Sequence, residues 1–222
     1  DLIDNHWTNP GEVPDNGIDD DNNGYVDDYN GWNVGSNNDN IAGGGHGTSV
    51  SGMIGATGNN GTGGAGVNWD VDILQVDMAG GLSESNVIAA YEYPKTLRDQ
   101  FNATGGHEGA FVVATNASWG IDQANPANYP AWCAYYDELG ISGILNCGAT
   151  ANQSWNIDNV GDMPTGCSSD YMVSVTATND NDVRTFSGYG VESIDLGAPG
   201  EQVYLPSGCL LYTSPSPRDL RK

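Results

Sequence analysis

Residues 71–78 read VDILQVDM, a short apolar run rich in β-branched side chains that ends shortly before two glycines. Similar runs recur along the chain at residues 110–115 (AFVVAT), 141–147 (ISGILNC), 171–178 (YMVSVTAT) and 193–196 (SIDL). Runs that are apolar almost throughout are typical of strands covered on both faces of a parallel sheet. The sequence therefore predicts a buried, mostly parallel sheet.

A long segment between two of these runs has helical character. Residues 83–101 start at Ser83, a favourable N-cap residue. The apolar side chains spaced for one helix face are Val87, Ile88, Tyr91 and Leu97. Pro94 falls inside the segment, so we expect a kink or an early end of the helix there.

Two further helices are predicted. Residues 131–139 precede Gly140, a residue type that commonly closes a helix. Residues 46–56 (HGTSVSGMIGA) are rich in small side chains, as is a helix packed tightly in a core. Because strands and helices alternate, we expect an α/β fold with a doubly wound sheet, whose functional site lies at the carboxyl ends of the strands.

The composition excludes several classes of function. The formal net charge is −23, and three of the six basic residues occupy the last five positions. Such a surface repels nucleic acids and anionic lipids and attracts divalent cations. No apolar run approaches the roughly 18 residues of a membrane span. We therefore predict neither a nucleic-acid partner nor a membrane span.

The four cysteines lack the paired spacing of a zinc site. Cys209 lies in an atypical tail, so at most one disulfide can form among Cys133, Cys147 and Cys167. Such a bridge would suit an exported protein. Buried free thiols are the alternative, and the sequence leaves both open.

The two ends of the sequence differ from its body. The first residues include no Met, basic region or apolar region of a signal peptide, so we expect any signal peptide to lie outside this sequence. Residues 209–222 (CLLYTSPSPRDLRK) are basic and rich in Pro and Ser, and residues 209–219 resemble the translation of a sequencing-library adapter. We assign residues 1–208 to one partial domain and interpret the tail, residues 209–222, as foreign; a natural Pro-rich tail is the alternative.

An acidic segment has the spacing of a calcium loop. Within residues 19–27, a side chain that carries oxygen occurs at every second position: Asp19, Asp21, Asn23, Tyr25 and Asp27. Gly24 stands where an EF-hand loop makes its sharp turn. Asn30 stands at the position where an EF-hand loop has the Glu that closes the site, and Asp28 could supply that ligand instead. We predict a structural Ca²⁺ site in this part of residues 1–45, with a solvated acidic turn as the alternative.

Motifs of one protein family occur in order along the chain. They are residues 45–52 (GHGTSVSG), 116–120 (NASWG), 148–152 (GATAN), 185–190 (TFSGYG) and 195–200 (DLGAPG). They resemble the HGTHVAG histidine motif, the N-x-S-h-G substrate strand, the AAAGN oxyanion segment and the FSNYG and DVxAPG runs of secreted bacterial subtilisin-like serine proteases, family S8. The resemblance implies a three-layer fold with a mostly parallel central sheet flanked by helices, truncated in this chain. We expect a secreted monomer.

The resemblance also implies roles for individual residues. His46 would be the general base and then the general acid, since an imidazole with a reference pKa of about 6.5 exchanges protons near neutral pH. Asn152 would donate to the oxyanion, although a turn residue or a glycosylated sequon are alternatives. Ser118, Trp119 and Gly120 would pair with substrate backbone as an added strand.

The other two members of a catalytic triad are not recognised in the sequence. Asp15 lies 46 − 15 = 31 residues before His46 in a segment that mimics DTGxD. However, the preceding residues are polar and contain two prolines, unlike a buried strand, so we expect the catalytic Asp upstream of residue 1. Nothing after Gly200 resembles the family's GTSMAxP serine motif.

We therefore expect a serine endopeptidase that acts on polypeptide substrates, with this chain an inactive fragment of it. The alternative is a non-catalytic, calcium-stabilised secreted relative. A protein that only binds calcium would leave the histidine and oxyanion motifs unexplained.

Overall fold

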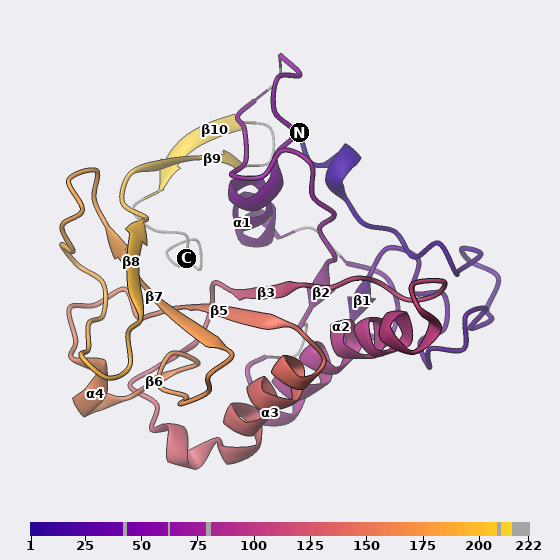
Figure 1. Ribbon diagram of the computed structural model, residues 1–222. Coiled ribbons are helices and arrows are strands. Elements are labelled where there is room, and N and C mark those ends of the chain that lie inside the picture. Colours follow the sequence, from indigo (N-terminus) through magenta and orange to yellow (C-terminus); the bar gives the residue numbers. More distant parts are fainter. Residues whose placement is uncertain (42–43, 62, 79–80, 208–209, 215–222) are drawn as a thin grey trace.

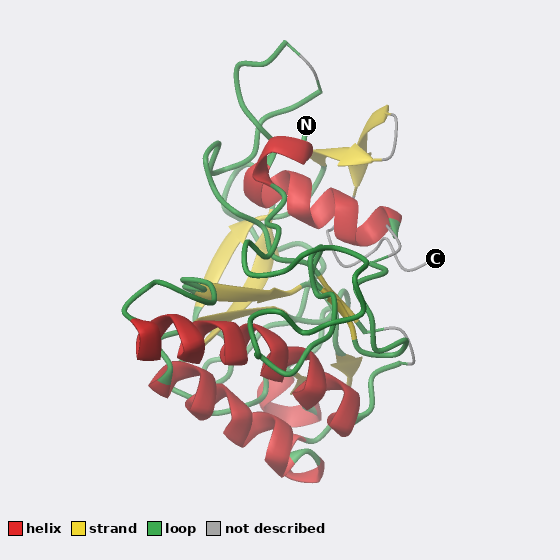
Figure 2. Cartoon of the chain, turned by 90° about the vertical axis from the view of Figure 1, so that its right-hand side faces the viewer, coloured by secondary structure: helices red, strands yellow, loops and turns green. Residues whose placement is uncertain are grey.

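The computed structural model describes residues 1–41, 44–61, 63–78, 81–207 and 210–214. Three layers are visible in both overall views: the central strands lie between helix α1 (Gly45–Gly55) on one side and helices α2 (Glu84–Thr104) and α3 (Pro130–Ile141) on the other (Figures 1 and 2). This arrangement confirms the predicted three-layer α/β fold.

The main sheet has four parallel strands in chain order: β3 (Ala114–Ala117), β5 (Leu145–Ala149), β7 (Met172–Thr178) and β8 (Leu196–Pro199). Ala117 pairs with Gly148, and Ala149 pairs with Val175. Because the strands are parallel and in register, their carboxyl ends meet at one edge of the sheet.

Shorter elements surround this sheet. Strands β1 (Trp32–Asn33) and β2 (Val76–Asp77) form a parallel pair. Two antiparallel pairs join β4 (Ile121–Asp122) to β6 (Asp162–Met163) and β9 (Val203–Ser207) to β10 (Leu210–Ser214). The remaining short helices are η1 (Ile3–Asn5), η2 (Pro126–Asn128) and α4 (Ile157–Val160).

Helix α2 confirms one sequence prediction and corrects another. Ser83 caps it, since its hydroxyl accepts a hydrogen bond from the Asn86 amide at 3.2 Å. Of the two outcomes expected at Pro94, a kink or an early end, the early end is wrong, because the helix continues to Thr104. Pro94 is buried together with Tyr93 and Leu97, so core packing of this face offsets the lost backbone hydrogen bond.

Helix α3 is longer than predicted, because it continues past Gly140 to Ile141. The sheet strand then begins at Leu145 rather than at Ile141. A Cβ atom at Gly140 would collide with the ring of Tyr171. Gly140 therefore permits close packing inside the helix instead of ending it.

Two apolar clusters form the core. The larger joins α2 and α3 to the main sheet through buried side chains that include Val87, Trp132 and Met172. The smaller cluster contains Trp32, Tyr93, Leu97 and Ala110. Among the described residues, no helix combines the length and apolar character that a membrane crossing requires.

One disulfide joins helix α3 to the segment after β6, at the larger cluster. Cys133 of α3 is bonded to Cys167, at a sequence separation of 34, and Cys147 is a half-buried free thiol. The structure thus selects one of the pairings that the sequence left open. The predicted tail lies mostly outside the described residues; its residues 210–214 form β10.

We predict that a Cys133→Ala/Cys167→Ala variant loses about 2–4 kcal/mol of unfolding free energy, because the bridge restricts a long loop in the unfolded chain. Urea denaturation of the oxidised wild type and the variant measures this difference. Cys147→Ala is the matched control, since it removes a thiol without a bridge. Equal midpoints for the wild type with and without reductant would contradict the prediction.

Candidate active site and acidic cluster

His46 is the second residue of helix α1, where it is half-buried. Small side chains explain how this helix packs. A Cβ atom at Gly55 would collide with Val71 and Ile73, so the glycine lets α1 approach the segment before β2 closely. The sequence prediction of a small-residue helix at residues 46–56 is confirmed to within one residue at each end.

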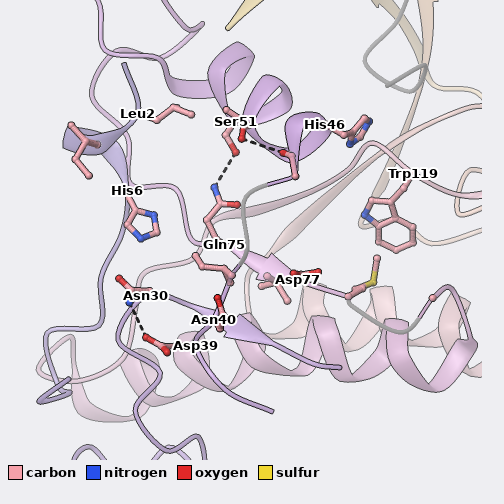
Figure 3. Close-up of a pocket in the computed structure, with 18 of the residues that line it drawn as sticks. Leu2, His6, Asn30, Asp39, Asn40, His46, Ser51, Gln75, Asp77 and Trp119 are labelled. Atoms are coloured by element: carbon pink, nitrogen blue, oxygen red, sulfur yellow. Dashed lines mark hydrogen bonds between the residues drawn. The ribbon is translucent and has the colours of Figure 1, made fainter. Parts of the chain in front are cut away.

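His46 lines an open cavity of about 1040 Å³. Figure 3 shows His46 and Trp119 near each other at one end of this cavity, with Leu2 and His6 at the opposite end. Between them, Gln75 donates a hydrogen bond to the Ser51 hydroxyl at 3.0 Å. All five predicted catalytic and substrate-binding residues are described by the structure. His46 and Trp119 line the cavity, whereas Ser118, Gly120 and Asn152 do not.

The predicted substrate segment directly follows strand β3. Ser118 is buried, and its hydroxyl accepts a hydrogen bond from the Asn116 amide group at 3.0 Å. The Trp119 ring lies 5.7 Å from the ring of Trp132 in α3, measured between centroids. Gly120 is half-buried and precedes β4. One wall of the cavity is therefore an indole held by the core.

Asn152 follows the neighbouring strand β5 and is half-buried. Its chain segment is fixed from two sides. The Thr150 amide donates to the Val175 carbonyl at 3.0 Å, and the Gly188 amide donates to the Ala151 carbonyl at 2.8 Å. Since β3 and β5 pair in register, the segments that carry Trp119 and Asn152 leave adjacent strands at the same edge of the sheet.

A buried carboxylate that sequence analysis missed supports this edge. Asp162 is fully buried, and its Oδ2 accepts hydrogen bonds from the hydroxyls of Thr165 at 2.5 Å and Thr150 at 3.4 Å. Asp162 lies ten residues after Asn152 and belongs to no recognised motif. Its supporting role is therefore visible only from its burial in the structure.

Asp15, the weaker sequence candidate for the triad, lies in an exposed turn with a φ angle of 60°. No strand precedes it among the described residues, which include all of positions 1–41. This environment differs from the strand end that a triad aspartate requires.

Two carboxylates of the predicted calcium loop accept backbone hydrogen bonds within turns. Asp19 accepts hydrogen bonds from the amides of Asn23 and Gly24, at 3.0 and 2.9 Å. Asp27 accepts from the amides of Asn16 and Gly17, at 2.9 and 2.8 Å. These two carboxylates therefore stabilise separate turns of the segment.

Asn23, another predicted ligand, donates its side-chain amide to Asp21 and Asp28, at 3.2 and 3.0 Å. The side-chain oxygen of Asn23 accepts from the amide of Tyr25 at 2.8 Å, and the Tyr25 ring packs edge-on against Trp32 with centroids 4.8 Å apart. Asp21 instead joins Glu12 and Asp28: one carboxylate oxygen of each lies within 4.8 Å of the other two. Among the described residues, these three carboxylates lie close enough together to hold a metal ion.

Burial is the main cause that raises the pKa of each carboxyl group in this trio, and neighbouring acids raise it further. Glu12 is 6% exposed and Asp28 is 0% exposed. Oxygen ligands of this kind suit hard cations such as Ca²⁺. The residues present therefore fit a calcium ion, through a set only partly shared with the sequence prediction.

Comparison with known proteins agrees with this geometry. The subtilase family profile (Peptidase_S8) matches residues 4–219. The chain belongs to the subtilase family. Among curated proteins, no significant match was found.

Solved subtilase-like structures share the fold. The S41 psychrophilic protease superposes with a TM-score of 0.59 at 22% identity, covering 80% of this chain and 61% of that one. The epidermin leader peptide processing serine protease of Staphylococcus aureus gives 0.60 at 17% identity, covering 87% and 51%. The prenylagaramide maturation protease PagA gives 0.57 at 17%, covering 78% and 58%. This subtilase chain thus spans between half and about three fifths of those structures.

We predict that Asp162→Ala in this subtilase lowers the free energy of unfolding by about 1–3 kcal/mol, because two buried threonine hydroxyls lose their acceptor. Urea denaturation followed by tryptophan fluorescence measures the change. Asp170→Ala, which removes an exposed carboxylate in the same region, is the control and should change stability little. Equal effects of the two substitutions would show that the buried network contributes nothing.

Proposed function

We propose that this chain is part of a serine endopeptidase that cleaves polypeptides through an acyl-enzyme. One observation carries the proposal: the histidine of the GHGTSVSG segment begins helix α1 and lines a cavity together with Trp119 of the predicted substrate segment. The subtilase match over residues 4–219 supports the same reaction class.

In this proposal, His46 accepts the proton of the serine nucleophile and returns it to the leaving amine. Asn152 donates to the oxygen that becomes negative in the tetrahedral intermediate, where a preorganised donor is most effective. The backbone of residues 118–120 pairs with the substrate, and Trp119 borders the adjacent cavity. The in-register ends of β3 and β5 support this division of roles, since they hold both segments at one edge.

We further propose that the catalytic Asp and Ser belong to parts of the whole protein outside this sequence, so that the chain by itself is inactive. The described residues after Gly200 form strands β9 and β10 and not the helix that should follow the nucleophile. In particular, Ser207 lies at the end of β9. Residues 209–222 remain a proposed foreign tail.

We also propose that the protein is secreted, monomeric and stabilised by Ca²⁺. The disulfide supports an oxidising compartment. The excess of acidic residues and the close approach of Glu12, Asp21 and Asp28 support cation binding. Of the five ligands that the sequence spacing suggests, Asp21 alone belongs to this trio.

This prediction concerns the complete protein, expressed from a gene that also encodes the catalytic Asp and Ser. In that protein, we predict that Asn152→Ala lowers kcat roughly 10²–10³-fold with little change in KM, because the lost donor acts mainly on the transition state. His46→Ala should lower kcat roughly 10⁴-fold or more. Hydrolysis of a chromogenic peptide measures both parameters.

Gln153→Ala is the matched control, because Gln153 is an exposed polar neighbour of Asn152. The chain of residues 1–222 alone should not react with a fluorophosphonate probe, whereas the complete protein should. A complete gene without an aspartate and a serine motif, and a product that does not react, would favour the non-catalytic relative instead.

We predict that a chelator lowers the Tm of this chain and that excess Ca²⁺ restores it, because an ion bound only to the folded state stabilises that state by mass action. At 100 times Kd, the expected stabilisation is about 2.7 kcal/mol. Differential scanning fluorimetry in chelator and in CaCl₂ measures the shift. An unchanged Tm would remove calcium from the proposal.

A further inference from the structure

The connection between strands β7 and β8 includes residues that lie beside the segment carrying Asn152. We call residues 184–193 of this connection the supporting segment. Ser187 attaches it to the sheet. The Ser187 side chain is 1% exposed, and its hydroxyl accepts from the Ala177 amide at 2.9 Å and donates to the Ala177 carbonyl at 3.0 Å. The supporting segment is therefore fixed to β7.

Two backbone hydrogen bonds join the supporting segment to the chain on either side of Asn152. The Gly188 amide donates to the Ala151 carbonyl at 2.8 Å, and the Tyr189 amide donates to the Trp155 carbonyl at 2.9 Å. Asn152 and the two residues after it lie between these bonds and are half-buried or exposed. The position of Asn152 thus depends on how firmly the two segments are held together.

A carboxylate joins the two segments at one end. Asp158 accepts hydrogen bonds from the backbone amides of Val191 and Ser193, at 2.7 and 2.9 Å. These hydrogen bonds lower the pKa of Asp158, so the carboxylate stays charged near neutral pH. A Cβ atom at Gly190 would collide with Asp158, so the glycine permits this contact.

Arg184 joins the two segments at the opposite end. One guanidinium nitrogen, Nη1, donates to the Ser154 hydroxyl at 2.9 Å and to the Ser187 carbonyl at 2.8 Å. The guanidinium also lies over the Tyr189 ring, with Cζ 4.6 Å from the ring centroid. Ser154 is two residues after Asn152, so Arg184 holds the part of the chain that lies between the two backbone hydrogen bonds.

The surroundings of Arg184 suit positioning more than charge neutralisation. Among the described residues, the one ion pair joins Lys95 to Asp99, and Arg184 pairs with no described carboxylate although the chain contains 29 acidic residues. Its charge is directed instead at a hydroxyl, a carbonyl and an aromatic ring. Hydrogen bonds from a charged donor are roughly twice as strong as those between neutral groups. The planar guanidinium can also stack on a ring while it donates.

We propose that Arg184 is a positioning residue for Asn152: by bonding Ser154 to the supporting segment, it fixes the direction in which the Asn152 amide points. The proposal rests on the proposed function, in which Asn152 donates to the oxyanion. Such a donor is effective only when its geometry is set before the reaction, to within about 0.5 Å. In this proposal Arg184 touches neither the substrate nor a reacting atom, so it acts through Asn152.

The test is a double-mutant cycle in the complete protein, measured with a chromogenic peptide. In the wild-type background, Arg184→Ala should lower kcat about tenfold and change KM less than about twofold, because a misplaced donor weakens binding of the transition state. In the Asn152→Ala background, the same substitution should lower kcat less than about twofold, because the donor that Arg184 positions is already gone.

Two further variants complete the cycle. Ser154→Ala removes an exposed hydroxyl that accepts from Arg184, so it should reproduce part of the loss in kcat without endangering the fold. Arg98→Ala is the matched control. Arg98 is also half-buried, donates to the Val112 carbonyl at 2.8 Å and lies over the Phe111 ring at 4.1 Å, but it bonds to neither segment. Its removal should leave kcat within about twofold of the wild type.

Hydrogen exchange in the chain of residues 1–222 measures the positioning without catalysis. In Arg184→Ala, the amides of Gly188 and Tyr189 should exchange at least about tenfold faster than in the wild type, because the two segments separate more readily. The Asn146 amide, which donates to the Tyr171 carbonyl at 2.9 Å in the main sheet, should exchange at an unchanged rate and so show that the variant is folded.

The outcomes distinguish this inference from the proposed function. If the complete wild type is active and Arg184→Ala lowers kcat equally in both backgrounds, Arg184 does not act through Asn152 and the inference is overturned. Unchanged kcat in the wild-type background, or unchanged exchange at Gly188 and Tyr189, overturns it as well. If the complete wild type hydrolyses no peptide, the proposed function fails, and the role of Arg184 in that reaction fails with it.

Discussion

Strand β5 pairs in parallel with β3 on one side and with β7 on the other, and this double pairing positions the candidate site. A one-residue change of register would turn each side chain to the opposite face of the sheet. The register fixes where the chain leaves the sheet, so the segments with Trp119 and Asn152 emerge side by side. Asp162 then secures the second segment through Thr150.

Much of the fold could be predicted from the sequence, because runs rich in apolar side chains mark the strands of the main sheet. The expected burial is only partly seen: β5 and β7 contain several buried residues, whereas β3 and β8 are largely exposed. Boundaries were less predictable where tertiary contacts override local preference. Pro94 remains within α2 because its helix face is buried, and Gly140 remains within α3 because Tyr171 packs against it. Neither contact leaves a local signal in the sequence.

The site was predicted unevenly for a similar reason. His46, Asn152 and the substrate segment belong to ordered motifs, so their identity is visible without a structure. Asp162 and Glu12 stand outside any motif, and their importance arises from burial among residues distant in sequence. The spacing of the acidic loop identified the segment in which carboxylates gather. Spacing alone could not tell which of these carboxylates cap turns and which face one another.

The main sheet also has a consequence for how the chain folds. Its strands lie in space in the same order as in sequence, and the paired residues are progressively nearer along the chain: Ala114 with Leu145, Asn146 with Met172 and Val175 with Leu196. Each new strand therefore meets an edge formed by the one synthesised before it. Such a sheet can grow in one direction as the polypeptide leaves the ribosome, with a modest loop-closure entropy at each addition.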